Sequence, residues 1–319
     1  EMCIRDSVKT LPSAGFFDGI RDNWGQAGRN AFGSGHEQRS RVSLKPRIIW
    51  PLTPTHPHKD TLVLQRVLIT GGAHRLGALL CNQFAQAGWE VWCHYQRSAD
   101  AAEALCASLR AQGHAARAIQ ARLEDEDSRR IMVQTIAEQS GPLHCLVNNA
   151  SSFEPDAGAA MDVAGARQQL EVNLLAPLSL SSLMAQTPLD APAGNRSIVH
   201  VLDQKVFNLN PDYFSYTVTK LALERAVALQ AQALAPAIRV CGVAPGLMFL
   251  SGPQTQANFE QAARVNLQRT PLDPAQVAAT CLFLAQNSAI NGVTIAVDNG
   301  QHLVPLERDV MFMVEGNAQ

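Results

Sequence analysis

In the segment Val67-Leu68-Ile69-Thr70-Gly71-Gly72-Ala73-His74-Arg75-Leu76-Gly77, three apolar residues run into a turn that contains two glycines. The apolar residues are typical of a buried strand, and positions 76 to 87 have the apolar spacing of a helix. Glycines at such a junction let the backbone approach a phosphate, and the helix amino terminus offers free N–H groups. A plain glycine turn is the alternative. We interpret the segment as a phosphate-binding loop with cofactor contacts from Gly71, Arg75, Leu76 and Gly77.

The same alternation of short apolar runs and helical patterns continues along the chain. Further strands are expected at 90–94, 116–120, 143–147, 197–202, 238–243 and 292–297, with helices at 101–111, 128–139, 166–185, 220–234 and 274–285. Because each right-handed crossover between parallel strands needs a helix, this order predicts a parallel sheet covered on both faces. The predicted fold class is α/β, a single doubly wound Rossmann-type domain with a seven-stranded parallel sheet. Functional residues should then lie at the carboxyl ends of the strands.

The composition predicts one globular domain with additional length at both ends. The chain has 319 residues, of which 46% are hydrophobic and 17% charged. Residues 1–63 have little hydrophobic periodicity, and we expect them to form an N-terminal extension that is disordered or artefactual. The domain is expected over 64–306, followed by a C-terminal tail over 307–319.

The net charge and the cysteine spacing limit the classes of binding partner and the cellular compartment that we expect for this protein. A net charge of −2 gives no electrostatic reason to expect a nucleic acid or an anionic membrane as a partner. The seven cysteines are scattered without Cys-x-x-Cys spacing, and no apolar run reaches the length of a membrane span. We therefore expect a cytoplasmic protein with reduced thiols, a small-molecule substrate and no metal.

Groups suited to proton transfer stand between 203 and 220. Tyr216 and Lys220 are four residues apart and share one face of the predicted helix. A nearby ammonium lowers the pKa of a phenol, whereas a carboxylate such as Asp203, placed at the end of the preceding strand, opposes the lysine and keeps the phenol protonated. The alternative is an ordinary amphipathic helix pair.

The end of the second strand indicates which nicotinamide cofactor binds. Tyr95 is followed by Arg97 and Ser98, and no acidic residue stands where an NAD-binding fold holds the ribose diol. An acid would repel a 2′-phosphate, whereas arginine and serine would bind it. The sequence therefore favours NADPH over NADH, unless Arg97 is only a solvated charge at a helix start.

Together these motifs resemble the short-chain dehydrogenase/reductase family over about residues 64 to 303. The resemblance rests on Thr70-Gly71-x-x-x-Arg75-x-Gly77, Asn148-Asn149-Ala150, Asn173, Tyr216-x-x-x-Lys220 and Pro245-Gly246. It implies that Tyr216 is the acid, that Lys220 binds the nicotinamide ribose and that Asn173 holds a water of the proton relay. It also implies cofactor contacts from Asn149, Ala150, Ser151, Pro245, Gly246 and Leu123, although Arg122 replaces an acidic residue usual near the adenine.

Within that family the sequence resembles the pteridine reductase branch. Arg75 stands in the glycine loop, and Ser151 and Phe153 follow Asn149-Ala150 where that branch binds its substrate. Asp203 precedes Tyr216 by 13 positions, where most family members have a serine and pteridine reductases an aspartate. The resemblance implies that Arg75, Ser151, Phe153, Asp203 and Tyr216 bind the substrate. Phe153 as a core aromatic and Asp203 as a structural acceptor remain alternatives.

The expected activity is hydride transfer from NADPH to a C=N bond of a pterin or dihydrofolate-like substrate. The family also implies a homo-oligomer, a tetramer or dimer, formed through the helices near 166–185 and 216–234. The family resemblance implies a substrate lid in the segment from 247 to 271. The sequence of this segment does not identify the substrate. Two alternatives remain open, a carbonyl reductase acting on a ketone or 3-oxoacyl substrate and a binding module that uses NADPH without turnover.

Overall fold

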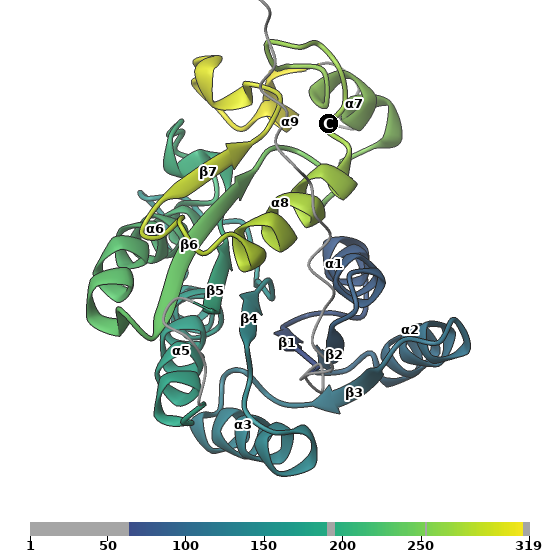
Figure 1. Cartoon of the computed structure of the whole chain (residues 1–319). Helices are drawn as coiled ribbons and strands as arrows, with labels where there is room; N and C mark the ends of the chain where they lie inside the picture. The colour runs from purple at the N-terminus through teal and green to yellow at the C-terminus, as the bar shows by residue number, and fades with distance from the viewer. Residues whose placement is uncertain (1–63, 190–194, 253, 315–319) are drawn as a thin grey trace, which may run out of the picture. The chain divides into compact units, whose positions relative to one another are not determined.

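The computed structural model describes residues 64–189, 195–252 and 254–314 (Figure 1). The N-terminal extension predicted over 1–63 and the last five residues of the predicted tail lie outside the described residues. Among the described residues, no helix has the length and hydropathy needed to cross a membrane.

Seven parallel strands of the described chain form one sheet, as the sequence predicts. The order across the sheet is β3-β2-β1-β4-β5-β6-β7, and every neighbouring pair is parallel. The strands are β1 (Arg66–Ile69), β2 (Glu90–Tyr95), β3 (Ala116–Gln120), β4 (Cys145–Asn148), β5 (Arg196–Val201), β6 (Ile238–Pro245) and β7 (Thr294–Val297). The order reverses between β1 and β4, the place where doubly wound sheets open a binding crevice.

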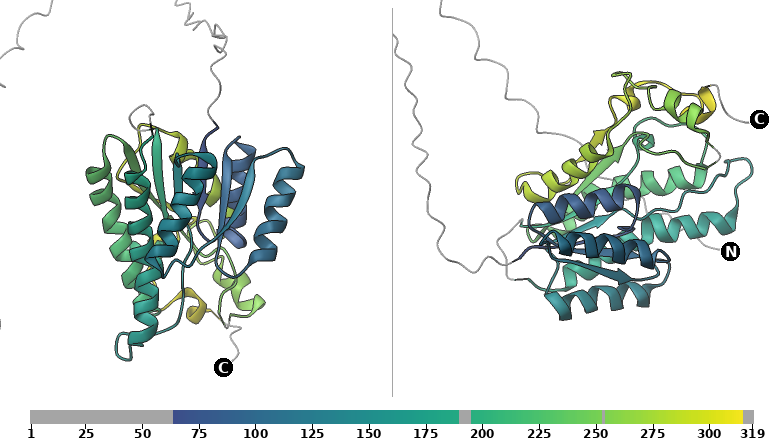
Figure 2. Two further views of the ribbon diagram at one scale, coloured as in Figure 1. Left: turned by 90° about the horizontal axis from the view of Figure 1, so that it is seen from below. Right: turned by 90° about the vertical axis from the view of Figure 1, so that its right-hand side faces the viewer.

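Helices cover both faces of this sheet (Figures 1 and 2). Because strand side chains alternate, Val67 and Ile69 join the apolar core under α1 (Arg75–Gln86), whereas Leu68 joins the core on the opposite face. The first core also includes side chains of α2 (Ala99–Ala111) and α8 (Pro274–Gln286). The second includes side chains of α3 (Glu126–Ser140), α5 (Ala176–Gln186) and α6 (Phe214–Leu234).

The helix expected over 166–185 is interrupted. It consists of α4 (Val163–Leu170), the π-helical turn η1 (Glu171–Leu175) and α5. A π-turn inserts one residue into the helical repeat and so turns the side chains that follow it. Here it contains Asn173, one of the predicted site residues.

Helix α6 begins at Phe214, before Tyr216 and before the start at 220 that the apolar pattern predicts. Tyr213 has a left-handed backbone with φ of 55°, which ends the preceding loop. The Asp156 carboxylate, which lies 59 residues away in sequence, accepts the Ser215 backbone N–H at 2.9 Å. This cap comes from a distant loop, so local periodicity could not locate it. The helix consequently places Tyr216 and Lys220 in its first two turns.

Two short α-helices and two 3-10 turns complete the described chain. The helices are α7 (Gln256–Ala262), within the segment where the resemblance implies a lid, and α9 (Val310–Met313), within the predicted tail. The turns are η2 (Gln204–Val206) and η3 (Gln301–Leu303). Of these, η2 directly follows Asp203, whose side chain accepts the Lys205 backbone N–H. That bond fixes the direction of the Asp203 carboxylate.

Candidate active site

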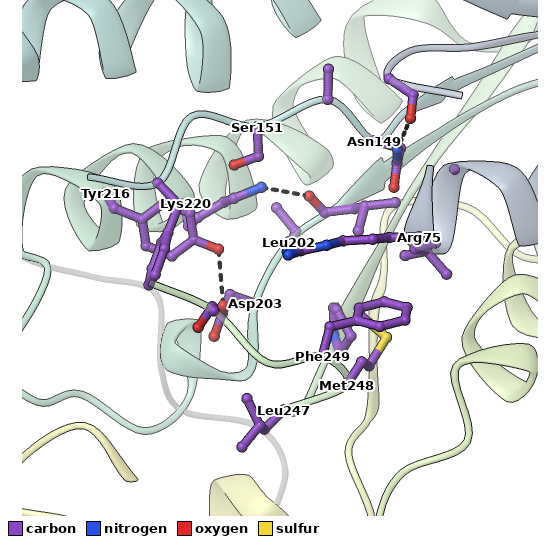
Figure 3. A pocket seen from close by; sticks show the side chains of 18 of the residues that line it. Arg75, Asn149, Ser151, Leu202, Asp203, Tyr216, Lys220, Leu247, Met248 and Phe249 are labelled. Atoms are coloured by element: carbon purple, nitrogen blue, oxygen red, sulfur yellow. Dashed lines mark hydrogen bonds between the residues drawn. The ribbon is translucent and has the colours of Figure 1, made fainter. Parts of the chain in front are cut away.

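The carboxyl ends of β1, β4, β5 and β6 surround a cavity of about 520 Å³. Most predicted site residues line it, and Figure 3 shows Arg75, Asn149, Ser151, Asp203, Tyr216 and Lys220 around one space. Gly71, Leu76, Gly77, Leu123, Ala150, Phe153, Pro245 and Gly246 line it as well. Tyr95, Arg97, Ser98 and Asn173 are not among its lining residues.

The turn after β1 packs too tightly against α1 for side chains. Gly71 has a φ of +62°, and a Cβ atom added to Gly77 would lie 2.0 Å from the Gly71 carbonyl oxygen. Arg75 opens the helix with a φ of 48°, and its guanidinium extends into the cavity (Figure 3). The first N–H groups of α1 have no partner within the helix, so this glycine cradle can receive an anion.

Buried polar groups hold this cradle in place. The Gly71 N–H donates to His94 Nδ1 at 3.0 Å, so the other imidazole nitrogen carries the proton that faces the Ala121 carbonyl. Burial lowers the pKa of His94 to about 4, which keeps the ring neutral. On the other side, the Thr70 hydroxyl accepts the backbone N–H groups of Asn149 and Ala150 at 2.9 and 3.0 Å. These hydrogen bonds hold the loop after β1 and the loop after β4 in a fixed position relative to each other.

Asp203, Tyr216 and Lys220 meet beside the cavity, as their spacing predicts. The Tyr216 hydroxyl donates to Asp203 Oδ2 at 2.9 Å, and Lys220 Nζ donates to the Val201 carbonyl at 2.8 Å (Figure 3). The Lys220 ammonium lies 5.6 Å from the centre of the Tyr216 ring. The phenol and the ammonium are both buried, at 6% and 3% exposure.

The charges of this trio agree with the expectation that Asp203 keeps Tyr216 protonated. Lys220 was expected to lower the phenol pKa and Asp203 to oppose it. Burial, followed by the negative charge and hydrogen bond of Asp203, raises the pKa of Tyr216 well above its usual value. Burial also raises the pKa of Asp203, against the opposing effects of Lys205 and Tyr216. Burial lowers the pKa of Lys220 to about 8, with Asp203 acting in the opposite direction. Tyr216 is therefore held protonated, next to a carboxyl group that binds a proton more readily than an exposed aspartate.

Phe153 lies in the cavity wall with aromatic neighbours. Its ring stacks on Tyr213, with centroids 4.1 Å apart and planes at 22°, and meets the edge of Tyr216 at 4.7 Å. Tyr213, Tyr216 and Met311 form a buried cluster against which Phe153 packs. The Phe153 ring thus has one fixed orientation beside the proton-donating phenol.

Asn173 lies behind the cavity and fixes its walls. Its Oδ1 accepts from the Ser152 backbone at 2.7 Å and from the Ser151 hydroxyl at 3.2 Å. Its Nδ2 donates to the Ser152 carbonyl and to the Thr219 hydroxyl. These bonds use both lone pairs and both hydrogens of the amide, so any relay water that Asn173 holds must bind to its main chain.

The end of the cavity beside β2 and β3 differs in detail from the sequence prediction. Arg97 is exposed, whereas His94 in β2 and Gln96 just after it line the cavity. The Gln96 amide donates to both oxygens of Glu124 at 2.9 and 3.0 Å. Sequence reasoning missed Gln96 and Glu124. The polar sequence after β2 and β3 was the only signal for them.

Several cavity-lining residues lie outside the motifs that the sequence analysis selected. Lys205, Gln301, Asp309 and Met311 line the cavity, and sequence reasoning selected none of them. From the segment of the predicted lid, Met248 and Phe249 line it (Figure 3). Lys205 lies two residues after Asp203, which is the one signal that could have identified it.

The doubly wound sheet and the residues around its cavity are those of a Rossmann-type oxidoreductase. The chain belongs to the short chain dehydrogenase family. The sequence profile of that family matches residues 65–262.

Known proteins within that family make the similarity more specific. Pteridine reductase 1 of Leishmania tarentolae is 33% identical over 278 residues, which cover 74% of this chain and 96% of the relative. The crystal structure of FolM Alternative dihydrofolate reductase 1 from Brucella canis, complexed with NADP, is 37% identical with a TM-score of 0.71 and covers 76% of this chain and 95% of that one. A 3-oxoacyl-[acyl-carrier-protein] reductase FabG of Staphylococcus aureus is 28% identical, covering 74% of this chain and 97% of the relative.

Proposed function

We propose that this oxidoreductase uses NADPH to reduce a C=N bond of a pterin or dihydrofolate-like substrate. The observation that carries the proposal is the 2.9 Å hydrogen bond from the Tyr216 hydroxyl to Asp203, beside the aromatic ring of Phe153. The similarity to a pteridine reductase and to an alternative dihydrofolate reductase supports the same substrate class.

The glycine cradle supports the choice of a dinucleotide cofactor. A Cβ atom on Gly77 would fill it, and Arg75 adds a cation where a diphosphate would lie. The B. canis structure contains NADP, and another similar structure, a blue fluorescent protein from a metagenomic library at 25% identity and a TM-score of 0.67, is in complex with NADPH. We assign the cradle, Asn149 and Lys220 to cofactor binding, with Arg97 and Ser98 near a 2′-phosphate.

Each residue beside the reaction centre has a separate task. When bound, NADPH supplies the hydride. Phe153 offers a flat apolar face on which a heterocycle can stack, and its contact with Tyr213 keeps that face from turning. Asp203 and Tyr216 hold a proton between oxygens 2.9 Å apart and can pass it to a ring nitrogen. Lys220 completes the site by keeping a positive charge close to the phenol.

The test is a substrate panel with purified protein. NADPH oxidation should be rapid with dihydropterins or dihydrofolate and slow with simple ketones and 3-oxoacyl thioesters. A second candidate, reduction of a carbonyl substrate, is favoured by the similarity to the 3-oxoacyl reductase. Turnover of ketones with none of dihydropterins would replace the first proposal by the second.

We also propose a cytoplasmic homo-oligomer. The helices implied by the family resemblance expose apolar side chains, including Leu175 at 47%, Val218 at 42% and Leu229 at 66%. Exposed apolar side chains on adjacent helices are suited to pairing with a second copy. The six described cysteines are all free and buried, which suits a reducing compartment. Size-exclusion chromatography with light scattering tests the assembly, and a monomer would contradict it.

A further inference from the structure

The segment 308–313, which we call the C-terminal wall, crosses the end of the cavity at which Asp203 and Tyr216 lie. The family profile ends at residue 262, well before this segment. Asp309, Val310 and Met311 nevertheless line the same cavity as the glycine cradle. The wall is therefore part of the site and not an appendage of the fold.

Two ionic contacts hold the start of the wall. The Arg308 guanidinium donates to both carboxylate oxygens of Asp212, at 2.7 to 2.9 Å, and the Asp309 backbone N–H donates to the same carboxylate at 2.7 Å. The Asp309 side chain pairs with Lys205 Nζ at 2.8 Å, and the Lys205 side chain is only 4% exposed. Forked pairs of this kind fix geometry as well as adding energy, so the wall has a defined position.

The thioether of Met311 completes this surface beside the aromatic rings. Met311 is 3% exposed, and the Tyr213 hydroxyl donates to its sulfur at 3.1 Å. Tyr213 in turn stacks on Phe153, so one continuous contact joins the wall to the ring face proposed for the substrate. From the outer side, the amide of Asn258 on α7 donates to the Met311 carbonyl at 3.0 Å. Met311 thus cannot withdraw without breaking contacts on two sides.

We propose that Met311 is a specificity-determining residue, which limits the length of the substituent on a heterocycle stacked against Phe153. This inference rests on the proposed function. Met311 clusters with Tyr213 and Tyr216, against which Phe153 packs, so a substituent directed toward this cluster must fit against the Met311 side chain. Methionine is unbranched, so a shorter side chain at this position enlarges the cavity and an aromatic one reduces it.

The experiment compares two dihydropterins that share the ring and differ in the substituent. The measured quantity is the ratio of kcat/KM for dihydrofolate to kcat/KM for 6-methyl-dihydropterin. Because one methylene in a pocket changes discrimination by about tenfold or more, Met311→Ala should raise this ratio about tenfold and Met311→Phe should lower it. NADPH affinity, measured by fluorescence titration, should not change in either variant.

Two further variants separate size from other effects. Met311→Leu keeps the volume and should leave the ratio near that of the wild type, even though it removes the sulfur acceptor of Tyr213. Met161→Ala makes the same change at a methionine that is 46% exposed and is not among the cavity-lining residues, and it should leave the ratio unchanged. If Met311→Ala folds poorly, Met311→Phe still tests the inference with the opposite sign.

The outcomes distinguish this inference from the proposed function. A wild-type enzyme that reduces both dihydropterins, with a ratio that neither Met311→Ala nor Met311→Phe moves, overturns only the role of Met311. A wild-type enzyme that reduces neither overturns the proposed function, and the role of Met311 with it.

Discussion

Replacing Asp203 by asparagine separates two roles that this carboxyl group can have in proton transfer. Asp203 accepts two hydrogen bonds at 2.9 Å, one from the Lys205 backbone N–H and one from the Tyr216 hydroxyl. Asparagine keeps a carbonyl oxygen for the first bond but places an NH2 group, which is a donor, opposite the phenol. The substitution therefore removes the charge, the acidic proton and the orientation of Tyr216, with little change in shape.

The size of the rate loss identifies the role. A hydrogen bond to a charged group contributes about 1.5–3 kcal/mol, which corresponds to about 10- to 150-fold in rate. If Asp203 only orients Tyr216, kcat should fall within that range. Removal of a general acid costs about 10²- to 10⁴-fold, so a loss above about 10³-fold would place Asp203 in the proton path. Single-turnover oxidation of bound NADPH measures the chemical step directly.

Asp162→Asn is the matched control for Asp203→Asn. Asp162 also accepts two backbone N–H groups, at the start of α4, but it is exposed and is not among the cavity-lining residues. Because asparagine caps a helix about as well as aspartate, this variant should keep wild-type turnover. Wild-type turnover in Asp203→Asn as well would refute any catalytic role for the carboxyl group.

The same variant gives a second readout in the pH dependence of stability. Burial raises the pKa of Asp203 in the folded state above that of the unfolded chain. The folded protein then holds more protons than the unfolded chain between these two pKa values, so wild-type stability falls as the pH rises through that window. Asparagine does not titrate, so Asp203→Asn does not lose stability in this way. The Tm of the variant minus the Tm of the wild type should therefore increase as the pH rises between the two pKa values. A relative Tm that falls there would contradict the burial argument.

Three further predictions concern the other groups around the cofactor and the phenol. Tyr216→Phe should lower kcat by about 10²- to 10⁴-fold and leave NADPH affinity unchanged in a fluorescence titration; unaltered turnover would exclude Tyr216 as the acid. Because burial lowers the pKa of Lys220 to about 8, its ammonium is lost as the pH rises through that value, and kcat should fall there in a pH–rate profile; a flat profile would mean that the charge is not needed. Arg97→Ala should weaken NADPH more than NADH, as measured by their Kd values, whereas equal losses would place the phosphate elsewhere.

Most of the sheet could be predicted because strand signals are local. The apolar run Val67–Ile69 lies within β1, and the strand predicted at 116–120 matches β3. The π-turn at Glu171–Leu175 was missed because five residues within a longer helix are too few to give a periodic signal of their own. Helices α7 and α9 have only seven and four residues, which is too short for a periodic signal.

In the site as well, local patterns could be predicted from the sequence, whereas contacts between distant residues could not. Tyr216 and Lys220 are four residues apart and Asp203 is 13 from the phenol, so a strand end and a helix start suffice to bring them together. The contact between Tyr213 and Met311 spans 98 residues and depends on how the wall crosses the finished sheet. No local pattern reports such a contact. Sequence reasoning therefore brought Asp203, Tyr216 and Lys220 together but did not find the surface that we propose selects the substrate.

The pKa shifts support our proposal that Asp203, at a position where the family resemblance implies a serine in most members, suits a C=N substrate. A weakly basic ring nitrogen becomes reactive when it is protonated, and a carboxylic acid donates a proton more readily than a phenol does. Tyr216 alone is a poor source, because burial and Asp203 raise its pKa well above the usual value. Asp203 differs, since burial raises its pKa and lets it hold a proton at a higher pH than an exposed aspartate does. A hydroxyl in its place could orient Tyr216, but it could not supply that acidity.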